Sequence, residues 1–173
     1  MPVLDVRDLS IRLATDEGSF SPVTGLDFAV EAGEILGIVG ESGCGKSVTL
    51  LALMGLLPAG SATSGSVVLE GRDLLDLGPG ALRGIRGAEM AMVFQDPMSS
   101  LNPYLSVGRQ VTEVLETHRG LGRDEARRLA GQLIEQVHVP DAAQCLDRYP
   151  HELSGGMRQR VMLAMALAGE PRV

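Results

Sequence analysis

One octapeptide, at residues 40–47, restricts the fold of this chain more than any other feature. Its letters, GESGCGKS, fit the pattern G-x-x-x-x-G-K-[ST] at every fixed position. The apolar residues 35–39 before it predict a buried strand, and the apolar residues 48–57 after it predict a helix. A glycine-rich loop between a strand and a helix turns successive backbone N–H groups into one concavity that accepts phosphate oxygens. This context favours a phosphate-binding loop over an ordinary glycine-rich turn.

Two side chains of this loop suit the chemistry of a nucleotide. Lys46 is the only lysine of the chain, and its other basic residues are all arginine. A compact ammonium on a flexible stem reaches the β- and γ-phosphates, and the Ser47 hydroxyl is a ligand for Mg²⁺. The residues expected to contact the nucleotide are Gly40, Glu41, Ser42, Gly43, Cys44, Gly45, Lys46, Ser47 and Val48.

Charge and apolar content argue against several classes of protein. The net charge of −7 and the scattered arginines argue against a nucleic-acid-binding surface. The first ten residues include acidic side chains and no apolar core, unlike a signal peptide. The longest apolar run, residues 48–57, is about half as long as a membrane span. Cys44 and Cys145 form no ligand or disulfide pattern, so we expect a reducing, cytoplasmic environment. Because no apolar run is long enough to cross a membrane, we expect a soluble protein that reaches a membrane only through a partner.

Apolar patterning predicts an α/β core with a largely parallel sheet. Alternation predicts half-buried strands at residues 9–13 and 26–30, and a continuous apolar run predicts a second buried strand at residues 90–94. A turn is expected at residues 32–33, and a strand followed by a turn at residues 66–71. The segments expected to be loops or irregular are residues 15–22, 58–65 and 74–87.

The second half of the chain predicts helices. Apolar residues share one helical face over residues 107–118 and again over residues 124–137, so residues 96–152 are expected to form a helical insertion. A last helix is expected up to Ala168, with Ser154 as its N-cap and Gly169 after its end. A serine and two glycines at a helix start are usually only a capped turn, but the same chemistry also binds anions.

Three motifs, in this order, resemble those of the ATP-binding cassette (ABC) ATPases. They are GESGCGKS, then Gln95 within MVFQDPMSSLNP, then LSGGMRQR at residues 153–160, which correspond to the Walker A loop, the Q-loop and the signature motif. FQDPMSSLNP and YPHELSGGMRQRVMLAMAL look most like the ATPases of dipeptide, oligopeptide and nickel permeases. The resemblance implies a RecA-like P-loop NTPase core with an N-terminal antiparallel β subdomain and a helical subdomain.

The resemblance also implies a role for each motif residue, with ATP and Mg²⁺ as cofactors. Two such domains are expected to pair head to tail, as a homodimer or heterodimer, with each ATP between one Walker A loop and the partner's signature motif. Ser154, Gly155 and Gly156 would then contact an ATP held by the partner subunit. Gln95 would act with Lys46 in catalysis, sense the γ-phosphate, and ligate Mg²⁺ together with Ser47 or position water. The alternative for Gln95 is a structural role, as a polar residue that caps the end of a strand.

Phe20 lies 26 residues before Lys46, where the family places an aromatic that stacks on adenine. The alternative is an ordinary loop aromatic that covers the core. The helical insertion would dock on an integral membrane permease, with residues 96–103 near that joint. The subunit would then be peripheral on the inner face of the cell membrane, with no nucleic acid as partner.

The family's Walker B strand, with its Asp-Glu end, and the switch histidine would follow Val173 and are not in this sequence. The expected parts are residues 1–95, the β subdomain with the first part of the core; residues 96–152, the helical subdomain; and residues 153–173, the signature motif and its helix. Without a Walker B Asp and a catalytic Glu, we expect a hydrolysis-deficient fragment of an ATPase with an incomplete core. By analogy with the family, the Walker B strand would lie next to the strand before the phosphate loop. Without it, two apolar strands keep unpaired backbone groups, so we expect the isolated chain to be marginally stable.

Three functions remain open at this point. The leading one is the ATP-binding subunit of an importer for peptides or a similar small solute. The others are a non-transport ABC ATPase that acts on nucleic acid or the ribosome, and a non-catalytic nucleotide-binding module. Arg158 and Arg160, inside the signature motif, either form a solvated helix face or touch a partner subunit.

Overall fold

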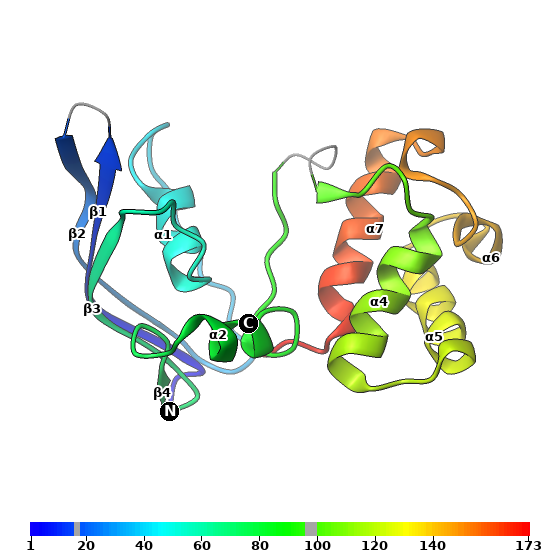
Figure 1. Ribbon diagram of the computed structural model, residues 1–173, viewed down its shortest axis with the longest axis horizontal. Helices are drawn as coiled ribbons and strands as arrows, with labels where there is room; N and C mark the ends of the chain where they lie inside the picture. Colours follow the sequence, from blue (N-terminus) through cyan, green and yellow to red (C-terminus); the bar gives the residue numbers. More distant parts are fainter. Residues whose placement is uncertain (16–17, 96–99) are drawn as a thin grey trace. The chain divides into compact units, whose positions relative to one another are not determined.

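The computed structural model describes residues 1–15, 18–95 and 100–173. The chain divides into two compact units, Met1–Arg83 with Val173, and Gly84–Arg172. Figure 1 draws the strands in blue to green within the first unit and the long helices in green to red within the second. The three-part division expected from the sequence stays a prediction.

The first unit contains a four-stranded antiparallel sheet in the order β2-β1-β3-β4. Leu4 of the first strand pairs with Val30 of the second and with Leu69 of the third, so β1 lies between them. Alternate residues of β1 are buried, as the apolar pattern requires. The strands are β1 (Leu4–Thr15), β2 (Gly18–Val30), β3 (Ala62–Leu69) and β4 (Arg72–Asp73).

Two short helices follow in this part of the chain, α1 within the first unit and α2 across the boundary at Arg83. Helix α1 (Lys46–Leu53) follows the phosphate loop and buries Thr49, Ala52 and Leu53. Helix α2 (Pro79–Ile85) lies where the sequence predicted irregular structure, so that prediction is wrong for these residues. The expected loop at residues 58–65 is also too long, because β3 begins at Ala62.

Most of the expected loop at residues 15–22 is strand instead, and residues 16–17 lie outside the described residues. Strand β1 continues to Thr15 and β2 begins at Gly18, so Phe20 lies within a strand opposite Leu13. Polar and turn-forming residues predicted a loop there. Pairing of residues 18–20 with residues 13–15 of the neighbouring strand extends the sheet instead.

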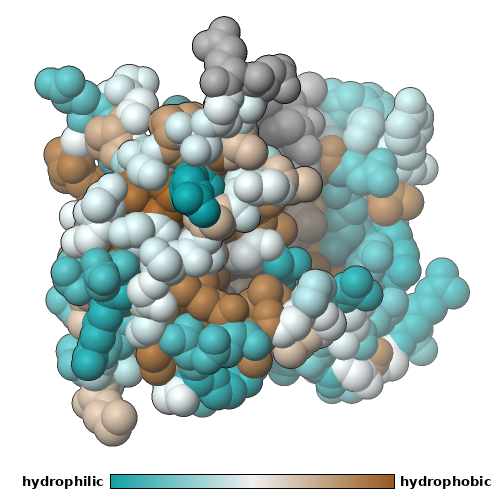
Figure 2. Space-filling model, turned by 60° about the vertical axis from the view of Figure 1, so that its left-hand side comes forward, coloured by the Kyte–Doolittle hydropathy of each residue, from teal (hydrophilic) through white to brown (hydrophobic). Residues whose placement is uncertain are grey.

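Neither predicted buried strand is a strand in the structure. Among the described residues, the segments 35–39 and 90–94 have no partner strand, apart from an isolated bridge between Arg86 and Met90. Ile35 and Val39 are each 95% exposed, although their sequence is that of a core strand. A strand exists only through hydrogen bonds to a neighbour, so apolar composition alone does not form one. Apolar surface is visible on the side of the molecule that carries the sheet (Figure 2).

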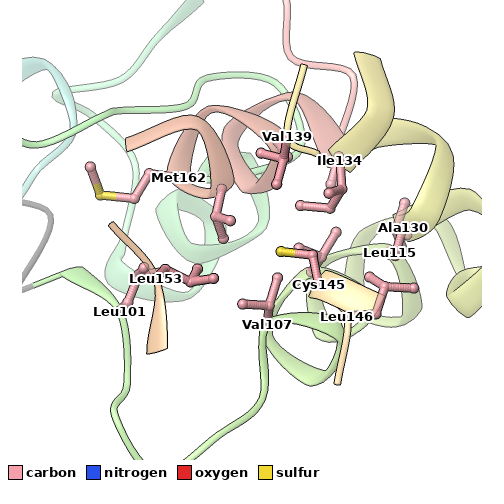
Figure 3. Packing of buried hydrophobic residues seen from close by; sticks show 14 of the residues in the cluster. Leu101, Val107, Leu115, Ala130, Ile134, Val139, Cys145, Leu146, Leu153 and Met162 are labelled. Atoms are coloured by element: carbon pink, nitrogen blue, oxygen red, sulfur yellow. The ribbon is translucent and has the colours of Figure 1, made fainter. Parts of the chain in front are cut away.

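The second unit is helical, and its three long helices confirm the sequence prediction. Their apolar faces enclose one buried cluster, which Figure 3 shows around Val107, Ile134 and Cys145. The side chains come from different helices and point toward one another, so this unit buries the apolar stripes that predicted it. The elements are α4 (Val107–Arg119), α5 (Arg123–Gln136), α6 (Ala142–Cys145), the 3₁₀ helix η1 (Pro150–Glu152) and α7 (Gly155–Ala168).

Within the described parts of the chain, no helix combines the length and the apolar character that crossing a bilayer requires.

Candidate functional site

The phosphate loop adopts a backbone shape that its glycines make possible. Gly43 and Gly45 have φ angles of 83° and 95°, in the left-handed region that other residues avoid. Gly45 is also buried against strand β2: a Cβ there would lie 2.9 Å from the Pro22 carbonyl oxygen and 2.9 Å from Val23. This contact was not predictable from sequence patterns, because it joins residues far apart in the chain. It fixes the point where the loop enters α1.

The Lys46 side chain folds back over the loop. Its Nζ atom donates to the carbonyl oxygens of Gly40, at 2.7 Å, and Glu41, at 2.6 Å, and it lies 3.4 Å from the Cys44 sulfur. Both oxygens are neutral acceptors, whereas a phosphate oxygen is an anionic one. Charge-assisted hydrogen bonds are the stronger kind, so an anion entering this loop competes well for the ammonium.

Helix α1 begins at Lys46 and leaves an electropositive end facing the loop. Its N-cap, Gly45, has no side chain that accepts a hydrogen bond, and the first turn carries no acidic residue. The first N–H groups of a helix lack intrahelical acceptors, so this end attracts anions. Thr49 donates both its N–H, at 2.8 Å, and its hydroxyl, at 3.0 Å, to the Gly45 carbonyl, which anchors the turn. Ser47 is exposed beside it.

Phe20 lies in the same unit as the phosphate loop. Phe20 is 53% exposed. It stands two residues before Pro22, whose carbonyl oxygen lies close to Gly45. The strand that carries Phe20 therefore passes the entry to α1, with an aromatic face open to solvent. Stacking of Phe20 on adenine stays a prediction.

The start of α7 is a second glycine-rich helix N-terminus. Ser154 is its N-cap, as the sequence predicted, and its hydroxyl oxygen accepts from the Met157 N–H at 3.3 Å. Gly155 and Gly156 are exposed, and a Cβ on either would meet nothing within 4 Å. No contact among the described residues therefore requires these two residues to be glycine, and this face is bare of described side chains.

Gln95 belongs to the second unit, in an exposed bend. The rest of the predicted Q-loop, Asp96 to Ser99, lies outside the described residues. The structure thus brings the phosphate loop and Phe20 together in one unit, and Gln95 and the start of α7 in the other. Any contact of these residues with nucleotide stays a prediction.

The fit to a metal depends on Ser47. Among the described residues, no group of three or more His, Cys, Asp or Glu side chains is placed to hold a metal ion. Mg²⁺ keeps most of its ligands as water and phosphate oxygens, so one exposed hydroxyl beside a phosphate loop fits this ion better than a fully protein-bound metal. Both Ser47 and Gln95 are exposed, as such ligands need to be.

Comparisons with known proteins agree with this geometry. The model of the ABC transporter family matches residues 23–173. The oligopeptide transport ATP-binding protein OppD of Haemophilus influenzae is 47% identical over 172 residues, which cover 99% of this chain and 53% of that protein. OppD of Escherichia coli is 47% identical over 171 residues, 99% of this chain and 51% of that protein. The chain spans about half the length of the curated relatives it matches.

Solved structures show the same fold. A dimeric post-hydrolysis state of the ATP-binding cassette MJ0796 bound to ADP and Pi superposes with a TM-score of 0.84 at 26% identity, covering 97% of this chain and 70% of that one. CbiO1 from Clostridium perfringens, part of the ABC transporter complex cbiONQ, has a TM-score of 0.74 at 26% identity, covering 98% and 62%. The predicted fold class is therefore confirmed, although the predicted largely parallel sheet is not seen among the described residues, where the sheet is antiparallel.

Proposed function

The chain belongs to the ABC transporter family, and from this we propose that it is part of the ATP-binding subunit of an importer for peptides. The relatives named above are oligopeptide transport ATP-binding proteins, and nearly the whole chain aligns with them. The complete subunit would bind and hydrolyse ATP, and hydrolysis would drive solute uptake.

The observation that carries this proposal is the conformation of the phosphate loop. Lys46 lies across the loop and donates to two neutral carbonyl oxygens, and α1 begins at that residue without a side-chain cap. Both features supply positive charge and N–H donors where phosphate oxygens would bind. Phosphoryl transfer requires such positioning more than it requires covalent chemistry.

The remaining residue roles extend this proposal. Phe20 would stack on the adenine, and Ser47 would place its hydroxyl against Mg²⁺, which when bound neutralises charge on the β- and γ-phosphates. Gln95 would contact the γ-phosphate and ligate the same ion. Ser154 and the two glycines after it would face the ATP of a second subunit, paired head to tail. Their bare surface supports this assignment.

Residues 1–173 by themselves are proposed not to hydrolyse ATP. Mg²⁺ in such sites normally keeps one or two carboxylates besides phosphate and water, and the described residues hold no carboxylate cluster for it. Turnover by the complete subunit, and none by residues 1–173, is the expected outcome of a steady-state phosphate-release assay. Equal turnover by both would contradict this part of the proposal.

The proposed partners are a second ATPase subunit and integral permease subunits, so the protein would act at the inner face of the membrane. The test is uptake of labelled oligopeptides by proteoliposomes that contain the complete subunit and its permease. ATP-dependent uptake that disappears in the Lys46→Ala variant is the expected result. ATP hydrolysis that nucleic acid or ribosomes stimulate, without any solute uptake, would instead support a non-transport ATPase.

A further inference from the structure

The first turn of α7 is held within the chain by the Ser154 cap and by Met157, which is partly buried against the helical core. Its glycines lower helix propensity and provide no side chain to pack. The side chains that α7 buries, at Val161, Met162, Ala164 and Ala168, all lie beyond that turn. Yet N–H groups bind a developing negative charge well only when they are held in place before it forms. Contacts that add to the Ser154 cap and to the packing of Met157 would therefore help to order this turn.

Arg160 provides one such contact, with the end of α5. Its Nη1 atom donates to the carbonyl oxygen of His138 and lies 3.4 Å from that of Val137. These residues follow the last turn of α5, where unpaired carbonyls and the helix dipole favour a cation. Helix α5 has no basic residue of its own in its last turn. Arg160 therefore supplies from α7 the positive charge and the donors that α5 lacks.

Arg158 provides a second contact, with η1. Its Nε atom donates to the Pro150 carbonyl at 2.7 Å, and the side chain is half-buried. Because successive helical residues are rotated by about 100°, residues two apart lie on nearly opposite faces of the helix. The two arginines therefore hold α7 from two sides, two and four residues after Gly156. These intrachain bonds add to the two sequence-based alternatives, a solvated face and a partner contact, which stay predictions.

We propose that Arg158 and Arg160, here called the arginine pair, are positioning residues for the signature motif. Their bonds to backbone carbonyls of η1 and α5 hold the first turn of α7 in the shape that receives the ATP of a second subunit. The pair touches neither ATP nor the reacting atoms. This inference rests on the proposed function, since it assigns a role within that same site.

The test measures ATP hydrolysis by the complete transporter with Arg158→Met or Arg160→Met. We expect kcat to fall about tenfold, because small displacements of positioning groups are costly in rate. KM, and binding of an ATP analogue to the isolated complete subunit, should change less than about twofold. Arg128→Met is the matched control, since Arg128 is an exposed arginine that bonds only to Gln132 among the contacts described.

Lysine variants separate positioning from general helix stability. At Arg160 the terminal nitrogen makes the contact, so Arg160→Lys should restore most of the rate. At Arg158 the Nε atom makes it, and lysine has no donor at that position, so Arg158→Lys should stay slow. These variants also keep the test decisive if a methionine variant fails to fold.

Two results would overturn the inference alone: methionine variants as fast as Arg128→Met, or a loss of ATP binding equal to the loss of rate. A wild-type transporter whose ATP hydrolysis does not depend on Lys46 would overturn the proposed function and this inference together. The Lys46→Ala variant, assayed in parallel, distinguishes the two failures.

Discussion

The phosphate loop and the start of α7 both place glycines at a helix N-terminus, but the glycines are needed for different reasons. In the phosphate loop the reasons are internal. Gly45 has a positive φ and lies against Pro22, and a Cβ on Gly40 would lie 2.6 Å from the Cys44 sulfur. At α7, a Cβ on Gly155 or Gly156 would meet nothing within 4 Å.

The two glycine-rich segments therefore differ in what requires glycine. In the phosphate loop it is required by contacts within the chain, and at the start of α7 no described contact requires it. The phosphate loop needs glycine for the backbone shape that it has in this structure, and nucleotide binding by that loop stays a prediction. The first turn of α7 would be more stable without glycine, and no contact among the described residues requires glycine there. Each substitution below tests one side of this comparison in the complete subunit.

The largest effect is expected at Gly45. In Gly45→Ala the new Cβ would meet Pro22 and Val23 at a φ that alanine rarely adopts. Strain of this kind costs about 1–3 kcal/mol, so we expect lower unfolding free energy and at least about tenfold weaker ATP binding. Chemical denaturation and equilibrium binding measure the two. Gly37→Ala is the control, since its Cβ would meet nothing within 4 Å.

Gly156→Ala should behave in the opposite way. Replacing glycine by alanine within a helix stabilises it by up to about 1 kcal/mol, and ATP binding to the isolated subunit should not change. ATP hydrolysis by the assembled transporter should nevertheless fall about tenfold, because a methyl group would occupy the bare face. Unchanged hydrolysis would mean that no other molecule approaches this face closely.

The caps of α4 and α7 offer a matched pair. The hydroxyl oxygens of Ser106 and Ser154 each accept a hydrogen bond, at 3.3 Å, from the backbone N–H three residues later in the chain. Alanine at either position should lower the free energy of unfolding by about 1 kcal/mol. Only Ser154→Ala should also slow ATP hydrolysis, since only Ser154 belongs to the proposed site. Equal effects of the two variants on hydrolysis would leave Ser154 as a cap and nothing more.

The smallest effect is expected in cysteine labelling. Cys44 is exposed in the phosphate loop, whereas Cys145 is fully buried, and burial raises the pKa of the Cys145 thiol. Bound ATP should slow alkylation of Cys44 several-fold, and Cys145 should stay unreactive with or without ATP. Mass spectrometry of the labelled peptides measures both. Equal labelling of Cys44 with and without ATP would argue against nucleotide in this loop.

The sequence predicted the helical unit better than the first unit, and the reason is local. The apolar stripes of residues 107–118 and 124–137 are buried within their own unit, so periodicity was sufficient. Residues 35–39 have equally clear apolar character but no partner strand among the described residues. Sheet formation depends on distant residues, which periodicity does not report.

The candidate site shows the same limit. The pattern G-x-x-x-x-G-K-[ST] located the loop, and the Ser154 cap followed from residue type. The contact of Gly45 with Pro22 and the bonds of Arg158 and Arg160 were not predicted. Each joins a side chain or a glycine to a backbone carbonyl elsewhere in the chain. Carbonyl acceptors exist at every residue, so the sequence carries no specific signal for them.

The most direct measurement is equilibrium binding of a labelled ATP analogue to the complete subunit with and without Lys46→Ala. The substitution removes the ammonium that lies over the loop and leaves the glycines that shape it. We predict at least about tenfold weaker binding, since hydrogen bonds to charged groups contribute about 1.5–3 kcal/mol. Equally tight binding by the variant would contradict the assignment of residues 40–47 as the nucleotide site.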